Sequence, residues 1–115
     1  MTALIEVGAG ICLLLLPALS LTLLLGLETP AGETKFVARV AGSALLALGV
    51  ASWMMRDEAD GAAPRGFLTG MSVYNAAAAI LFAYAAIGLK MTGLLLWPVV
   101  LLHAIMAVWC LTRLR

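Results

Sequence analysis

Charged residues are scarce in this chain. Only 11% of its 115 residues are Asp, Glu, Lys or Arg, whereas 64% are hydrophobic. About a quarter of the residues of an ordinary soluble domain are charged, so this composition is typical of a membrane protein. The formal net charge is +1 and the basic residues form no patch, which argues against nucleic acid as a partner.

Cysteine and histidine are also rare, and their scarcity limits the possible cofactors. Cys12 and Cys110 both fall inside apolar runs, so we interpret them as small apolar side chains and not as a disulfide framework or metal ligands. The single histidine, His103, excludes a bis-histidine haem within one chain, and no zinc or iron–sulfur spacing occurs. We therefore expect no metal site and no cofactor.

Sequence motifs of common enzymes are missing. The chain has no Gly-x-Ser-x-Gly motif, Walker loop, dinucleotide-binding glycine pattern or zinc-protease helix motif. Its serines and threonines have no base at a useful spacing. The sequence therefore argues against an enzyme.

Long apolar runs are what the chain has in abundance. At 1.5 Å per residue, about twenty apolar residues match the roughly 30 Å hydrocarbon core of a bilayer. No basic residue precedes the first run, so we interpret that run as a span and not as a signal peptide. The fold class that we predict is an all-α membrane protein, a single domain in which four transmembrane helices form a compact bundle of two helical hairpins. The predicted spans are residues 3–25, 36–55, 67–89 and 94–114.

Two of these spans contain residues that shape a helix. Pro17 lacks the amide that would bond the carbonyl of Leu13, which predicts a kink near the middle of the first span. In the second span, Gly42 and Gly49 lie seven residues apart on one helical face. Small residues on one face let a neighbouring helix approach closely, so we expect this face to pack against another span.

Basic residues are distributed unequally between the two ends of the spans. Four arginines lie at the end that would hold both termini, namely Arg56, Arg65, Arg113 and Arg115. The opposite end has Lys35 and Lys90, with Arg39 one turn inside the helix. The positive-inside rule then predicts a multi-pass protein with both termini in the cytoplasm.

Three polar groups from different spans fall at one depth. Counted from the cytoplasmic end at 1.5 Å per residue, Asn75 lies at about 13 Å, and His103 and the freed carbonyl of Leu13 both lie at about 15 Å. Polar side chains at such a depth are candidates for function. With Ser72 and Tyr74, Asn75 and His103 form our candidate ligand-binding site, in an apolar lining suited to a small apolar molecule or lipid. The alternative is that these groups only bridge helices, with contributions of about 0.6 kcal/mol.

Two further charges are interpreted as interfacial. Glu6 lies about one turn into the membrane, where we expect it to reach water or to pair with Arg65 or Arg113. Arg39 belongs to the opposite boundary, and we expect it to extend outward to the interface or to pair with an acid of the loop at residues 26–34.

The order of several short motifs carries a resemblance. The motifs are Glu6, Leu13 to Pro17, Leu24-Leu-Gly26, Ala38-Arg-Val-Ala-Gly42, Leu45-Leu-Ala-Leu-Gly49, Tyr74-Asn75, and Leu96-Trp-Pro-Val followed by His103. In this order the chain resembles a group of small bacterial integral membrane proteins and is distantly similar to DoxX-like proteins. The resemblance implies a four-helix fold in the bacterial inner (plasma) membrane and transfers no activity.

Three functional classes follow from these observations. The first is an accessory or scaffolding subunit of the membrane, with membrane lipids, a second copy of the chain or a larger membrane protein as partners. The alternative is a binder or transporter of a small apolar molecule or lipid that uses the Asn75 and His103 cluster. A membrane enzyme ranks last.

Overall fold

The protein is all-helical in the part of the chain that the structure describes. The computed structural model describes residues 2–58 and 61–115, and these two segments contain helices and turns but no strand. The all-α fold expected from the sequence is therefore confirmed. The five helices of these segments are α1 (Thr2–Leu15), α2 (Pro17–Leu25), α3 (Gly32–Met54), α4 (Ala62–Ile87) and α5 (Leu96–Leu114).

Three helices have the length and apolar character needed to cross a membrane by themselves. These are α3, α4 and α5, whereas α1 and α2 qualify only as one bent pair. Alone, α1 has 14 residues, which is about 21 Å at 1.5 Å per residue and shorter than the roughly 30 Å hydrocarbon core. The described chain thus holds three candidate spans, or four if the bent pair counts as one, which is compatible with a multi-pass membrane protein.

The first span breaks at Pro17, more sharply than the kink we expected. The axes of α1 and α2 differ by 116°. Proline disfavours the helical conformation of the residue before it, and Leu16 accordingly leaves the helix, with φ −125° and ψ 57°. The Leu16 carbonyl then accepts bonds from the backbone amide (3.0 Å) and the hydroxyl (2.9 Å) of Ser20, which starts the new helix.

Helix α1 packs closely along α3, as the small residues of α3 predicted. A Cβ atom added to Gly10 would lie 2.8 Å from the carbonyl oxygen of Gly42, and one added to Gly42 would lie 2.8 Å from that of Gly10. Gly49 lies in the same way against Val7, whose backbone nitrogen would be 3.0 Å from the added Cβ. The two backbones are therefore in direct contact through their glycines.

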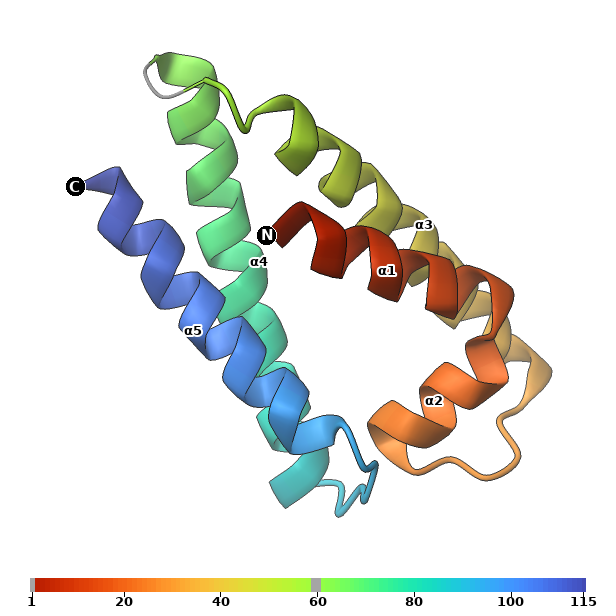
Figure 1. The fold of residues 1–115 in the computed structure, drawn as a ribbon. Coiled ribbons are helices and arrows are strands. Elements are labelled where there is room, and N and C mark those ends of the chain that lie inside the picture. Colours follow the sequence, from red (N-terminus) through yellow and green to blue (C-terminus); the bar gives the residue numbers. More distant parts are fainter. Residues whose placement is uncertain (1, 59–60) are drawn as a thin grey trace.

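The helices form two pairs, which Figure 1 shows side by side. Helix α1 packs on α3, and α4 packs on α5. The short helix α2 turns away from α1 and contacts both α3 and α5. On the α3 side, Leu21 of α2 joins Leu13 and Ala38 in one buried apolar cluster.

On its other side, α2 is held by the loop between α4 and α5. Gly26 ends α2 in the left-handed conformation, with φ 75°, and its amide bonds the carbonyl of Thr22. The amide of Leu95 donates to the carbonyl of Leu23 at 2.8 Å. Gly93 lies directly against the backbone of Leu24, with no room for a Cβ atom. Helix α2 thus connects the two helix pairs.

Candidate functional site

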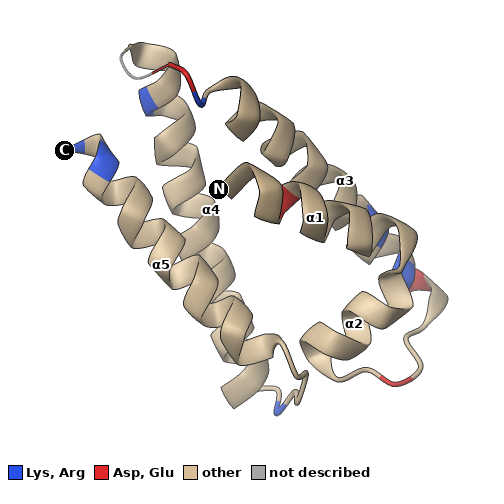
Figure 2. Ribbon diagram, viewed as in Figure 1, with Lys and Arg blue, Asp and Glu red and all other residues tan. Residues whose placement is uncertain are grey.

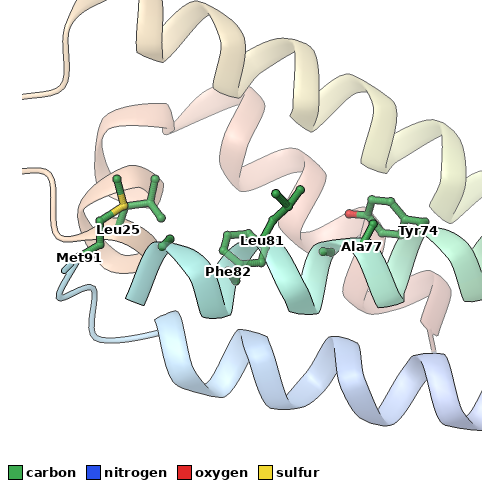
Figure 3. Close-up of a pocket in the computed structure, with 8 residues that line it drawn as sticks. Leu25, Tyr74, Ala77, Leu81, Phe82 and Met91 are labelled. Atoms are coloured by element: carbon green, nitrogen blue, oxygen red, sulfur yellow. The ribbon is translucent and has the colours of Figure 1, made fainter. Parts of the chain in front are cut away.

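An apolar groove runs along α4 (Figure 3). It has a volume of about 430 Å³ and is bounded by α4, the end of α2 and the start of the α4–α5 loop. Tyr74 contributes a hydroxyl group, and the remaining lining residues are Leu25, Ala77, Ala78, Leu81, Phe82, Ala85 and Met91. We call this feature the apolar groove. Tyr74 lies at one end of it, and Leu25 and Met91 lie together at the other.

His103 packs behind two side chains of the apolar groove. Its ring centroid is 5.9 Å from that of Tyr74 and 5.7 Å from that of Phe82, with interplanar angles of 58° and 57°. Tilted pairs at 4.5–7 Å are favourable contacts between ring edges and faces. The Nδ1 atom of His103 lies 2.9 Å from the carbonyl oxygen of Val99. A carbonyl only accepts, so Nδ1 carries the hydrogen in this bond, and the ring is held in place against α4.

Asn75 and Ser72 are buried in α4 and are bonded within their own helix. The Nδ2 group of Asn75, which is 1% exposed, donates to the carbonyl of Met71 at 2.8 Å, while its Oδ1 atom has no partner in the described chain. The hydroxyl of Ser72 donates to the carbonyl of Leu68, also at 2.8 Å. Such bonds to the preceding turn are a common way for short polar side chains to be satisfied inside a helix.

The structure therefore brings together one part of the candidate site. Tyr74 and His103 are in contact, whereas no hydrogen bond joins Asn75 to His103 within residues 2–58 and 61–115. Adjacent residues of a helix point about 100° apart, so Tyr74 and Asn75 face different directions. The prediction that Asn75 and His103 meet considered only their depth in the membrane and not the direction in which each side chain points around its helix. A role of the four residues in ligand binding stays a prediction.

Glu6 differs from the interfacial charge that we expected. Its side chain is buried, with 4% of the residue exposed, and its Oε2 atom accepts a hydrogen bond of 2.8 Å from the hydroxyl of Ser52. Its Oε1 atom has no partner in the described chain. The described residues form no ion pair between Glu6 and Arg65 or Arg113. Arg65 instead donates to the carbonyl of Leu114 at 3.3 Å.

The sequence analysis did not predict Ser52 as the partner of Glu6, because it considered only charged partners for this carboxyl group. The signal was nevertheless present, since Glu6 near the start of the first span and Ser52 near the end of the second lie close to the same end. In an antiparallel pair these positions meet.

Arg39 lies exposed on α3. No ion pair joins it to Glu28 or Glu33 in the described part of the chain. Its side chain is therefore free to extend outward, as expected for a basic residue near a membrane boundary.

A second hollow, which we call the polar cleft, lies between the starts of α1 and α4 and the ends of α3 and α5. It has a volume of about 530 Å³. It is lined by Thr2, Ala3, Ser52, Trp53, Met55, Arg56, Glu58, Pro64, Phe67, Leu68, Trp109 and Arg113. The guanidinium group of Arg56 lies 4.0 Å from the ring centroid of Trp53, and that of Arg113 lies 5.1 Å from that of Trp109. Arg56 also pairs with Asp57 at 3.3 Å.

The apolar groove and the polar cleft are thus two hollows in the described part of the chain. Among the described residues, no three His, Cys, Asp or Glu side chains come close enough to share a metal ion. No family model, no curated protein and no solved structure matches the chain.

Proposed function

We propose that the chain is a four-span protein of the bacterial inner membrane with both termini in the cytoplasm. The bent α1–α2 pair then forms the first span, and α3, α4 and α5 form the others. The charge distribution supports this orientation. Figure 2 shows basic residues at the start of α4, in the α3–α4 connection and at the C-terminal end. By their positions in the sequence these are Arg65, Arg56, and Arg113 with Arg115.

The orientation is tested by labelling two alanines that border opposite loops. In a background without Cys12 and Cys110, we expect Ala31→Cys to react with a membrane-impermeant maleimide in intact cells. Ala62→Cys should react only after the cells are permeabilised. Both alanines are exposed, so accessibility from the bulk solvent is matched. Reversed labelling would place the termini outside.

We further propose that the protein binds the hydrocarbon chain of a membrane lipid in the apolar groove. The groove itself is the observation that carries this proposal. Its volume of about 430 Å³ falls within the roughly 300–1,000 Å³ that is typical of ligand sites. Its lining is almost wholly apolar, which suits a ligand that makes few hydrogen bonds.

The shape of the groove favours a lipid chain over a compact molecule. Its α4 wall from Tyr74 to Ala85 covers about 16 Å at 1.5 Å per residue. This is about half of the roughly 30 Å hydrocarbon core, which is the depth that one lipid tail occupies. We expect the head group to lie near Met91, at the α4–α5 loop, and the tail to end near Tyr74.

A bulky residue in the groove should reduce lipid retention. Ala77 lines the groove and is exposed, so Ala77→Trp fills the groove without disturbing buried packing. Native mass spectrometry of protein extracted in mild detergent should show a bound lipid in the wild type. We expect roughly tenfold weaker retention in Ala77→Trp, equivalent to about 1.4 kcal/mol.

Ala76→Trp is the matched control, because Ala76 is equally exposed on α4 but does not line the groove. It should retain lipid as the wild type does. Equal losses in both variants, or a wild type that holds no lipid, would contradict the proposed site.

An accessory or scaffolding subunit is the second candidate, and one feature of α4 favours it. Gly66 and Gly70 lie four residues apart, and a Cβ atom added to either would meet no atom within 4 Å. Small residues at this spacing, left without a neighbour, suit close approach of another transmembrane helix. The same mass spectra would then show a second protein chain in place of a lipid.

A further inference from the structure

Glu6 is the one acidic or basic residue that is buried in the described part of the chain. It is 4% exposed, and of its two oxygens only Oε2 has a hydrogen-bond partner in the described chain. A buried polar atom without a partner is rare in folded proteins and calls for an explanation. An ionised carboxylate held here by a single hydroxyl would be poorly compensated, because buried charges are ordinarily paired with an opposite charge.

Ser52 contacts this carboxyl group directly, and two titratable side chains of the other long helices interact with it at longer range. Ser52 of α3 donates to it at 2.8 Å. Tyr74 of α4 and Cys110 of α5 lie close enough to interact with it electrostatically. These are the two titratable groups of α4 and α5 on which Glu6 acts electrostatically. No lysine or arginine of the described residues forms an ion pair with Glu6. The chain's amino group, five positions before Glu6, lies outside the described residues.

Glu6 lies next to a residue that lines the polar cleft. Its partner Ser52 lines the polar cleft, together with Thr2 and Ala3 from the first turn of α1. Its neighbour Tyr74 lines the apolar groove. Ser52 therefore borders the polar cleft and at the same time donates to the carboxyl group.

We propose that Glu6 and Ser52 form a proton-binding site that exchanges its proton with water in the polar cleft. In the loading step a hydronium ion in the polar cleft breaks one O–H bond and becomes water, its proton forms an O–H bond on Oε1 of the carboxylate, and the carboxyl group becomes neutral. The hydrogen bond from Ser52 to Oε2 stays in place. Release reverses the step, and one unit of charge appears among α1, α3, α4 and α5. This proposal does not depend on what occupies the apolar groove.

A proton fits this site better than a metal cation does. Hard cations such as Ca²⁺ take six to eight oxygen ligands. The polar contact that the described chain supplies at Glu6 is the Ser52 hydroxyl, and no group of three metal-binding side chains occurs among the described residues. A proton needs only one oxygen.

The test uses dicyclohexylcarbodiimide, an apolar reagent that reacts with neutral carboxyl groups inside membranes. The O–H group of the acid adds across a C=N bond of the reagent, and the acyl group then moves from oxygen to nitrogen to give a stable N-acylurea. We expect intact-mass and peptide analysis of the full-length protein to find the adduct on Glu6. Labelling should fall roughly tenfold for each pH unit above its midpoint, as for any single titrating group.

Two variants and one independent measurement complete the test. Glu6→Gln should remove the adduct, and Glu33→Gln, which changes an exposed acid, should leave it. Infrared spectra of the wild type in D₂O should show a protonated-carboxyl band that disappears as the pH rises, with the same midpoint pH as the labelling. This measurement does not depend on whether a variant folds. Labelling that does not change with pH, an unlabelled Glu6 or a missing infrared band would each overturn the proposal. Loss of lipid binding in Ala77→Trp would leave this result unchanged.

Discussion

Gly10→Ala should destabilise the detergent-solubilised protein by about 2–3 kcal/mol, measured by thermal or chemical unfolding. The added methyl group would lie 2.8 Å from both the Gly42 carbonyl oxygen and the Leu46 amide nitrogen. These are backbone atoms, so α1 has to move away from α3 to make room. Overfilling a packed interface costs about 1–3 kcal/mol, and a rigid backbone neighbour places this site at the upper end.

Gly8→Ala, two residues earlier on the same helix, provides the control. A Cβ atom at Gly8 meets nothing within 4 Å. Alanine favours a helix over glycine by about 0.5–1 kcal/mol, so this variant should be unchanged or slightly stabilised. The two substitutions are chemically identical, and their difference isolates the α1–α3 contact. Equal stability of the two variants would show that α1 does not rest on α3 through Gly10.

This contact was partly visible in the sequence. Gly42 and Gly49 share a face of the second span, and the expectation that a helix packs there agrees with the close approach found in the structure. Apolar runs likewise predicted the approximate places of α3, α4 and α5, because the length of a span is set by the thickness of a bilayer. The first run, predicted as one span, forms the bent pair of α1 and α2. Periodicity along one helix does not say which partner helix fills the face, so the choice of α1 came only from the structure.

The break at Pro17 shows a different limit. A proline predicts a disturbed helix, and the sequence therefore indicated a kink. The 116° turn depends on where α2 finds contacts, namely Ala38 on one side and the α4–α5 loop on the other. Those contacts join residues far apart in the chain, and no local pattern contains them.

The sequence predicted the depth of the candidate site residues in the membrane but not the directions in which their side chains point. Counting residues placed Asn75 and His103 at one level, yet the ring of His103 meets Tyr74 and Phe82. For Glu6, the short distance from the start of the span suggested contact with water. Glu6 is instead buried, and it is bonded to Ser52 near the end of α3, the helix on which α1 packs. Both differences arise from the rotation and offset of packed helices.

Gly93→Ala should have the largest effect of all, because it acts where α2 joins the two helix pairs. Gly93 lies against the backbone of Leu24 with no space for a methyl group. The substitution should push the α4–α5 loop away from α2 and break the bond of 2.8 Å from the Leu95 amide to the Leu23 carbonyl. We expect a loss of about 3 kcal/mol or more, from overfilling and from the lost hydrogen bond together.

Hydrogen exchange gives this prediction a local measurement. The Leu95 amide should exchange much faster in Gly93→Ala than in the wild type, since its protection comes from the bond to α2. Gly32→Ala is the control, because a Cβ atom at Gly32 meets nothing within 4 Å, and this variant should keep both its stability and the protection of Leu95. A protected Leu95 amide and unchanged stability in Gly93→Ala would mean that the loop does not rest on α2.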